Sequence, residues 1–501
     1  MLTRNVFANL IGGVWVAVLT LAIAPIQVHL LGVEAYGVIG FISTLQVVVG
    51  VLDLGLSSTL TREIAGDRTP DRRASRDLVR TSVTIYWALA AVSGAAIVLL
   101  ADPLAHRWFN PDTIDIDTLE RALQVGAIYL ASRWPVVLYT GVISGSQRMD
   151  VLNTVKIGAV TVRLVGGIIV LILWPQLTFF LWWLGISSII EVAAYLVAAR
   201  RVMPDADWRP GLSLEALRTV WSFSLQMAAL ALLSMVLTQV DRLMISKMLP
   251  LKELGYYSLA YTAATGISLV ISSVSTALMP SFAAAHEAGE REPMLVRYEA
   301  ANRAMLFSTG LVLFSLAFFG RPLLSLWVSP AAATVAWVPL ALLAGGFWFS
   351  AAVSNAYTSS IALRRPSGPL LISAATAVLY VPLMYGMVRT WGINGAAGAW
   401  LVLNACYVVT IIPFVHWKVL RIAVAPWFLT NLIPFACLGL LTFGLARALL
   451  ALWGPSGIAA EVVTLVAAAA TYSLLGYTLL GETLKTGLQD ILRRRRLGLN
   501  P

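Results

Sequence analysis

Two arginines lie inside long apolar stretches of the sequence, where ionisable residues are rare. Arg133 is in the middle of one stretch, and Arg163 is about two helical turns into the next. An ionisable residue inside a bilayer costs roughly 2.5–3.5 kcal/mol on insertion scales, so it usually faces a partner or a solvated cavity. Guanidinium groups bind phosphate oxygens in bidentate fashion, which favours a phosphate-bearing ligand over a cationic drug. We predict that Arg133 and Arg163 line an internal cationic cavity, with Arg242 as a third candidate.

Three acidic residues in apolar stretches could bind a coupling ion or act as gates. They are Asp53, Asp241 and Glu191. Asp53 and Glu191 also lie near the ends of their stretches, from which a carboxylate could instead reach the lipid head groups. Asp241 adjoins Arg242, and these two could form a structural pair with another helix. The sequence leaves these alternatives open.

The spacing of the other reactive residues argues against metal and nucleotide chemistry. The two cysteines and four histidines form no HExxH motif and no Cys/His cluster. A GxxxxGK[ST] phosphate loop is also missing from the sequence, which excludes ATP hydrolysis by that route. We therefore predict no catalytic residues, no metal site and no cofactor.

The elements that must position the charged residues are membrane-spanning helices. Of the 501 residues, 59% are hydrophobic and 12% are charged, and the mean hydropathy is +0.81. A soluble domain has about 25% charged residues, so this chain has too little polar surface to face water. Apolar runs of about 20 residues span a bilayer as helices, because lipid offers no partner to unpaired backbone groups. We predict such spans near 6–30, 35–61, 79–101, 121–146, 157–174, 177–199, 217–248, 255–282, 302–320, 334–363, 368–390, 393–416, 426–450 and 457–481.

The polar gaps between these runs are too short for a catalytic or nucleotide-binding domain. The longest gaps are 62–78, 102–120, 200–216 and 283–301. The first run could be interpreted as a signal peptide ending at Ala24, but its length and the following Pro25 favour a retained helix. The predicted fold class is an all-α integral membrane protein with about fourteen transmembrane helices.

The distribution of basic residues predicts the orientation in the membrane. The net charge is +10, from 35 Lys and Arg against 25 Asp and Glu. The loops on the side of the N-terminus hold 25 of the basic residues and the opposite loops hold seven. Because basic loops stay cytoplasmic, both termini are predicted to be cytoplasmic. The basic tail 484–501 would then contact cytoplasmic head groups, an interpretation favoured over nucleic-acid binding.

An internal repeat relates two parts of the chain at a fixed offset of 218 residues. Matches continue without a gap across the second to sixth and the eighth to twelfth predicted helices, and include Leu31/Leu249, Gly37/Gly255, Ser57/Ser275, Leu60/Leu278, Ala65/Ala283, Tyr139/Tyr357, Trp182/Trp400 and Arg200/Lys418. An offset of six helices gives both copies the same orientation, which favours a transporter with its pathway at the repeat interface. We predict an N-terminal lobe (1–205), a C-terminal lobe (206–424) and two further helices (425–483).

Four stretches of the sequence carry a family resemblance. They are LLGVEAYGVIGFISTLQVVVGVLDLGLSSTLTREIA from Leu30, GVISGSQRMDVLNTVKI from Gly141, QVDRLMISKMLPLKELGYYSLAY from Gln239 and WGINGAAGAW from Trp391. They resemble bacterial polysaccharide-transport flippases of the O-antigen type. This resemblance implies the multidrug/oligosaccharidyl-lipid/polysaccharide exporter superfamily. The resemblance covers most of the chain. It implies two six-helix bundles around a central cavity, in the inner membrane of a bacterium.

The resemblance also implies a substrate and partners. Such flippases move undecaprenyl-diphosphate-linked oligosaccharides from the cytoplasmic to the periplasmic leaflet, for the assembly of O-antigen, capsule or exopolysaccharide. The expected partners are this lipid-linked oligosaccharide, membrane lipids, and polysaccharide polymerase and chain-length proteins, with no nucleic acid.

Three alternatives compete with this interpretation. A multidrug antiporter of the same superfamily has twelve helices and usually an acid in the first helix, whereas no acid lies between Arg4 and Gly32. The lipid II flippases fit the quoted stretches less well. A membrane polysaccharide polymerase or ligase generally needs a sizeable outer loop, and the largest here is 102–120. We therefore expect a transporter rather than an enzyme.

Overall fold

The computed structural model describes residues 2–51, 53, 55–66, 73–453 and 457–481. The regular elements within these ranges are all helical. In chain order the α-helices are α1 (Leu2–Leu31), α2 (Val33–Val51), α3 (Leu56–Gly66), α4 (Arg73–Pro103), α5 (Ile116–Gly145), α6 (Met149–Leu173), α7 (Leu177–Val202), α8 (Leu214–Met248), α9 (Leu251–Ala264), α10 (Gly266–Glu287), α11 (Arg291–Trp327), α12 (Pro330–Ala362), α13 (Ser367–Phe414), α14 (Val424–Trp427), α15 (Ile433–Trp453) and α16 (Ile458–Leu479). Three π-helical turns occupy Leu104–Trp108, Val415–Leu420 and Phe428–Leu432.

Most of the long helices in the described ranges are candidate membrane spans. Twelve described segments are long and apolar enough to cross a membrane. One of them, Ser367–Leu420, holds two spans, because α13 is kinked at Gly392, where φ is +57°. The 30-residue α5, which carries Arg133, is long enough to cross a membrane but is not one of these twelve segments. The predicted all-helical membrane fold is confirmed.

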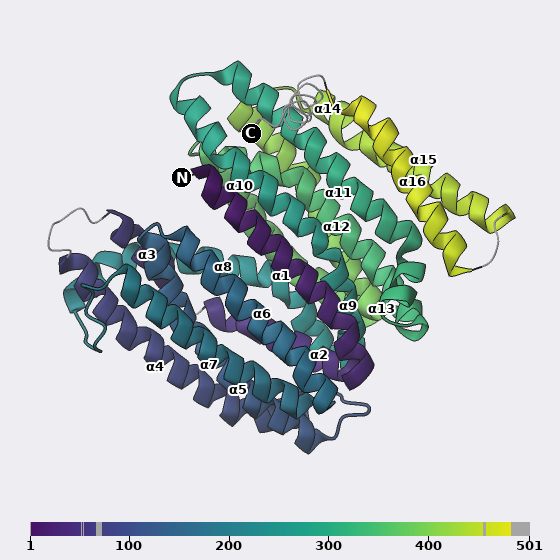
Figure 1. The fold of residues 1–501 in the computed structure, drawn as a ribbon. Helices are drawn as coiled ribbons and strands as arrows, with labels where there is room; N and C mark the ends of the chain where they lie inside the picture. Colours follow the sequence, from purple (N-terminus) through teal and green to yellow (C-terminus); the bar gives the residue numbers. More distant parts are fainter. Residues whose placement is uncertain (1, 52, 54, 67–72, 454–456, 482–501) are drawn as a thin grey trace, which may run out of the picture. The chain divides into compact units, whose positions relative to one another are not determined.

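The chain divides into two compact units, and the first is Met1–Ser258. In this unit α5 packs along both α4 and α7, α7 packs along α6, and α6 packs along α1 (Figure 1). Buried aromatic side chains, among them Tyr86, Trp134 and Tyr139, fill the space between α4 and α5. The Trp134 indole donates a hydrogen bond to the hydroxyl of Ser93 at 2.8 Å, which satisfies its polar atom inside the core.

The second unit is Leu259–Pro501, in which α12 packs along α11 and α13. The last two long helices, α15 and α16, pack against each other and along α11. Tyr472 of α16 stacks on Phe307 of α11 with ring centroids 5.6 Å apart, and its hydroxyl donates to the Phe307 carbonyl at 3.2 Å. Arg447 of α15 donates to the carboxylate of Glu461 on α16. These contacts attach α15 and α16 to the bundle.

The 218-residue repeat is visible in the helix boundaries. Three pairs of helices begin 218 residues apart, namely α2 and α9 (Val33, Leu251), α4 and α11 (Arg73, Arg291), and α6 and α13 (Met149, Ser367). The kink of α13 at Gly392 lies 218 residues after Trp174, the C-cap residue that follows α6. The predicted two six-helix repeats followed by two C-terminal helices are therefore confirmed. The lobe boundaries near 205 and 424 remain predictions, and the basic tail 484–501 lies outside the described residues.

Within the first unit, α2 and the start of α9 cross at glycines that are equivalent in the repeat. A Cβ added to Gly37 would lie 2.7 Å from the carbonyl oxygen of Leu251, and one added to Gly255 would collide with the carbonyl oxygen of Val33. The offset of 218 relates the two contacts, because Gly37 corresponds to Gly255 and Leu251 corresponds to Val33. Such reciprocal contacts are expected where two elements meet at a twofold axis. Glycine at both positions lets the two backbones approach closely.

Several helix boundaries differ from the sequence-based predictions, among them the start of α11 at Arg291 rather than 302 and the break between α9 and α10 in the run predicted at 255–282. The run predicted at 35–61 is interrupted, because α2 ends at Val51 and α3 begins at Leu56 after Gly55, whose φ is +73°. The helix predicted from residue 157 already begins at Met149. A hydropathy pattern records only the apolar part of a helix, whereas the helix itself continues into the polar boundary region of the membrane.

Candidate functional site

Three of the predicted site residues meet within the first unit. Arg133 on α5 donates from Nη1 to Oε2 of Glu191 on α7 at 2.8 Å, and from Nη2 to Oε1 at 3.3 Å. Arg163 on α6 donates from Nη1 to the same Oε2 at 2.8 Å. We call these residues the arginine–glutamate triad. A single carboxylate thus joins three neighbouring helices.

The triad is almost buried and carries a formal charge of +1. The side chains of Arg133 and Arg163 are each 17% exposed, and that of Glu191 is 6% exposed. Removing charges from water is costly unless they are paired and hydrogen-bonded. Glu191 therefore makes two buried arginines tolerable. The triad as a whole keeps one net positive charge.

An aromatic ring forms one wall of the triad. The ring centroid of Tyr129, on α5, lies 5.8 Å from Cζ of Arg133 and 5.9 Å from Cζ of Arg163. At this distance the face of the ring attracts a guanidinium. The Tyr129 hydroxyl donates to Oε1 of Gln46 on α2 at 2.8 Å. Sequence reasoning missed both residues, although Tyr129 lies one helical turn before Arg133 and so shares its face.

Small residues on α6 bring Arg163 within reach of α7. A Cβ added to Gly167 would lie 3.0 Å from the ring of Phe180, and one added to Gly166 would collide with the ring of Trp183. The Trp183 indole also donates to the backbone carbonyl of Arg163 at 2.9 Å. This close packing fixes the distance between Arg163 and Glu191.

The depth of two triad residues corrects the sequence-based expectation. Glu191 is near the middle of the 26-residue α7 and is 5% exposed, so the interpretation that it reaches the head groups is wrong. Arg163 is about four turns into α6 rather than two, because the helix begins at Met149. The sequence suggested separate roles for the arginines and for Glu191, whereas the structure joins them in one group.

Asp53 lies in the break between α2 and α3 rather than inside a helix. Its Oδ2 accepts hydrogen bonds from Oγ of Ser57 at 2.6 Å and from the Ser57 backbone at 3.3 Å, in the manner of a helix N-cap. Its Oδ1 accepts from the hydroxyl of Tyr86 on α4. These contacts support a structural role, and its predicted role in ion coupling remains a prediction.

Asp241 and Arg242 lie on α8 and have other polar partners. Asp241 is 3% exposed and accepts a hydrogen bond from the hydroxyl of Tyr257 at 2.6 Å. Arg242 donates from Nη1 to Oε1 of Gln239 at 3.2 Å. Their predicted roles, as a coupling acid and a third cationic ligand, remain predictions.

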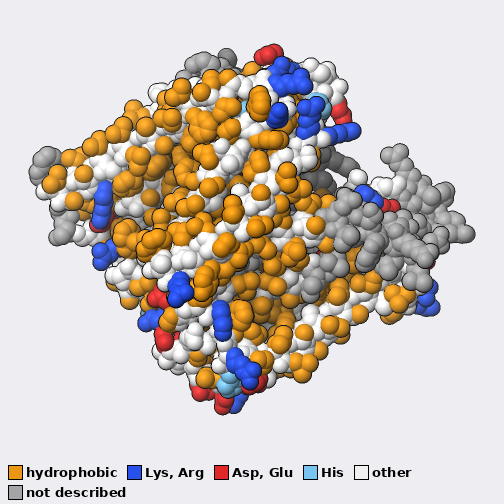
Figure 2. Space-filling model, turned by 180° about the vertical axis from the view of Figure 1, so that it is seen from behind, with side chains coloured by type: hydrophobic (Ala, Val, Ile, Leu, Met, Phe, Trp, Pro, Cys, Tyr) orange, Lys and Arg blue, Asp and Glu red, His pale blue; other side chains and the backbone are white. Residues whose placement is uncertain are grey.

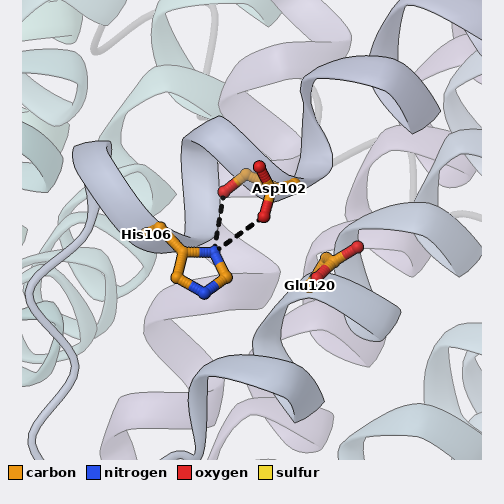
Figure 3. A group of neighbouring side chains, drawn as sticks. All are labelled: Asp102, His106 and Glu120. Atoms are coloured by element: carbon orange, nitrogen blue, oxygen red, sulfur yellow. Dashed lines mark hydrogen bonds and ion pairs between the residues drawn. The ribbon is translucent and has the colours of Figure 1, made fainter.

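Asp102, His106 and Glu120 form a polar group where α4 ends and α5 begins (Figure 3). Nδ1 of His106 lies 3.0 Å from Oδ1 of Asp102 and 3.2 Å from the Asp102 carbonyl oxygen. Glu120, on the neighbouring helix in Figure 3, accepts a hydrogen bond from Gln124 at 2.7 Å. Asp102 and His106 are exposed and each group has a local partner, so we interpret the cluster as side-chain pairs at the helix ends.

Comparisons with known proteins agree with the geometry of the fold. A family model described as Polysaccharide biosynthesis protein matches residues 2–286. A Shigella flexneri protein named "Putative O-antigen transporter" is 21% identical over 377 residues, which cover 74% of this chain and 87% of that protein.

Solved structures of membrane transporters share the fold. Lipid II flippase MurJ in an inward closed conformation has a TM-score of 0.72 at 12% identity, covering 95% of this chain and 99% of that one. The MATE multidrug transporter DinF-BH has a TM-score of 0.60 at 12% identity, covering 83% of this chain and 96% of that one. The family match spans more than half of the chain. The chain therefore belongs to the Polysaccharide biosynthesis protein family, as a multi-pass membrane transporter with the fold of MurJ and the MATE transporters.

Proposed function

We propose that this transporter is a flippase that moves undecaprenyl-diphosphate-linked oligosaccharides from the cytoplasmic to the periplasmic leaflet. The family match and the name of the Shigella flexneri relative support a lipid-linked glycan as its substrate. The observation that carries the proposal is the arginine–glutamate triad, in which two buried arginines on neighbouring helices share one carboxylate.

The proposed substrate has two parts with opposite solvent preferences. Its diphosphate and sugars cannot enter hydrocarbon unaided, because burying an unpaired charge costs several kcal/mol. Its polyprenyl tail is apolar and stays in the bilayer. The protein therefore has to shelter only the head group. Guanidinium groups suit the diphosphate because they offer bidentate, charge-assisted hydrogen bonds.

Glu191 acts in this proposal as an internal counterion that the substrate replaces. In the structure the two oxygens of Glu191 accept hydrogen bonds from Arg133 and Arg163. A bound diphosphate takes these positions, and Glu191 then withdraws. Exchange of one anion for another keeps the charge nearly balanced, which allows the head group to be released on the far side. Glu191 is therefore the gating residue.

The remaining residues complete a cycle of alternating access. Arg242 supplies a third cationic ligand, and Asp53 and Asp241 couple an ion to the movement of the two repeats. The basic loops orient both termini toward the cytoplasm of a bacterial inner membrane. The same pathway would involve a polysaccharide polymerase and chain-length proteins on the periplasmic side.

Two other transported substrates make different demands on the site. A multidrug antiporter must attract cations, which the net positive triad disfavours. A lipid II flippase also handles a diphosphate, so only the glycan distinguishes it from the proposed function. Both alternatives can be tested with the same assay.

Transport by reconstituted protein tests the proposal. Proteoliposomes would contain a fluorescent undecaprenyl-diphosphate oligosaccharide, lipid II or a cationic dye, and loss of fluorescence to an external quencher would report flipping. The proposal predicts transport of the oligosaccharide, with a rate lowered at least about tenfold in the double variant R133Q/R163Q. The control R447Q breaks another Arg–Glu pair, between α15 and α16, and should retain the wild-type rate. Equal rates for R133Q/R163Q and wild type, or transport of only the dye or only lipid II, would refute the proposal.

A further inference from the structure

A polar cavity of about 580 Å³ lies in the second unit, at ends of its helices. Three turns line this cavity, namely the α10–α11 turn, the α12–α13 turn and the turn after Val415–Leu420. They contribute four arginines, Arg291, Arg364, Arg365 and Arg421. The distribution of Lys and Arg predicts that these turns are cytoplasmic. Figure 2 shows several Lys and Arg side chains grouped at one margin of a largely apolar surface.

Backbone carbonyl groups hold two of these arginines in place. Arg291 donates from Nη2 to the carbonyl oxygens of Leu420 at 3.0 Å and Arg421 at 3.1 Å. Arg365 donates from Nη1 to the carbonyl oxygen of Lys418 at 3.4 Å. A neutral carbonyl orients a guanidinium without cancelling its charge.

The positive charge of the cavity is only weakly compensated. In the part of the chain that the structure describes, the carboxylate paired with these four arginines is Glu287, 3.7 Å from Arg364. Both side chains of this pair are mostly exposed, so the pair is weak. The cavity therefore offers several guanidinium groups to an incoming anion.

The backbone of the three turns is unusual at the arginines. Each turn has one residue in the left-handed region, with φ of +71° at Gly289, +57° at Arg364 and +54° at Arg421. Residues with a Cβ seldom adopt this conformation, and glycine or asparagine adopts it more easily. Two of these positions hold arginine, and the corresponding turn of the first copy also has a non-glycine residue in this region, Gln147, with φ of +58°.

The first copy of the repeat shows that the fold does not require this cluster. The offset of 218 places Ser146, Gln147 and Met203 at the positions of Arg364, Arg365 and Arg421, and Arg73 at the position of Arg291, so three of the four arginines have no basic counterpart. The nearby Arg148 is neutralised by Asp150, to which it donates two hydrogen bonds at 3.0 and 3.1 Å. A general need for basic residues at the cytoplasmic surface does not explain why four arginines surround one cavity in the second copy.

We propose that this cavity binds the phosphate group of a lipid head, as a second phosphate site separate from the arginine–glutamate triad. Its arginines provide bidentate donors for phosphate oxygens. Its predicted place at the cytoplasmic surface is the depth at which lipid phosphates lie. Two lipids offer this chemistry, an anionic phospholipid and the undecaprenyl diphosphate of a substrate not yet transported. The second source rests on the proposed function.

Native mass spectrometry of the full-length protein in detergent tests this inference. The probes are phosphatidylglycerol, phosphatidylcholine and undecaprenyl diphosphate, each added separately. The variant R364G/R421G removes two guanidinium groups while glycine keeps the left-handed turns. The variant R364K/R421K keeps the charge and removes the bidentate donors. The control R148Q removes a basic side chain from the corresponding turn region of the first copy.

We expect wild type to retain a phosphate-bearing anionic lipid in preference to phosphatidylcholine. R364G/R421G should bind it about tenfold more weakly, R364K/R421K should be intermediate, and R148Q should match wild type. Preference for phosphatidylglycerol would identify a phospholipid site, and preference for undecaprenyl diphosphate would identify a capture site for substrate. If the R133Q/R163Q variant still binds the lipid, the binding site is separate from the triad. Failure of the proposed function would then leave this inference standing. Equal binding by R364G/R421G and wild type, or an equal loss in R148Q, would overturn it.

Discussion

Arg133 and Arg163, on neighbouring helices, each place a guanidinium nitrogen 2.8 Å from the same oxygen of Glu191. Because both arginines donate to the same oxygen, a change at one of them alters the hydrogen bonding of the other. A ligand anion that replaces Glu191 therefore has to satisfy both guanidinium groups. Binding at this site is expected to involve α5 and α6 together.

The substitution Glu191→Gln tests the countercharge. It leaves two buried guanidinium groups without an anion, and removing one partner of a buried ion pair typically costs about 3–5 kcal/mol of stability. We expect a matching fall in the free energy of unfolding, measured by thermal or denaturant unfolding in detergent. Undecaprenyl diphosphate should restore part of the loss, because it supplies the missing negative charge. The control E461Q alters the more exposed Arg447–Glu461 pair, and an equal effect of both substitutions would contradict the role of Glu191.

The substitution Gly166→Leu tests how α6 reaches α7. Its side chain would collide with Trp183 and push α6 away, so we expect a loss of about 1–3 kcal/mol in unfolding free energy and a slower transport rate. Gly158→Leu is the matched control, because a Cβ at that position of the same helix has nothing within 4 Å. Stability and transport would be measured for both variants. Wild-type behaviour of G166L would show that close packing is not what positions Arg163.

The crossing of α2 and α9 predicts equal sensitivity at two equivalent glycines. Gly37→Ala and Gly255→Ala each force a Cβ against a backbone carbonyl, so each should lower the unfolding free energy by about 1–3 kcal/mol. The double variant should lose less than the sum, because both substitutions disturb one contact. Gly50→Ala on α2 is the control, with nothing within 4 Å of the added Cβ. Full additivity would argue against a single shared crossing.

Two substitutions at Asp53 separate its structural role from ion coupling. Asp53→Ala removes the cap of α3 and the acceptor for Tyr86, so stability should fall by about 0.5–2 kcal/mol, as for other lost helix caps. Asp53→Asn keeps an acceptor oxygen and should retain most of the stability. If Asp53 also carries a coupling proton, transport by D53N should no longer respond to a pH gradient across the vesicle. An unchanged response would remove Asp53 from the coupling residues.

Much of the fold could be predicted from the sequence, because lipid imposes simple requirements. Long apolar runs had to be helices, and the offset of 218 linked Gly37 to Gly255 before any contact between them was known. The break after Val51 was missed because hydropathy outweighed the turn signal of Gly55. The charged residues of the triad were identified, but their pairing was not. Pairing depends on how α5, α6 and α7 are rotated about their axes, which is set by contacts such as Gly166 with Trp183.

The affinity of the purified protein for undecaprenyl diphosphate, compared with uncharged undecaprenol, tests the central claim most directly. The claim is that Glu191 and the diphosphate compete for Arg133 and Arg163. Relative to wild type, E191Q should bind the diphosphate about tenfold more tightly and R133Q/R163Q about tenfold more weakly, each a difference of about 1.4 kcal/mol, with no change for undecaprenol. Equal affinity of all three proteins for the diphosphate would contradict the account.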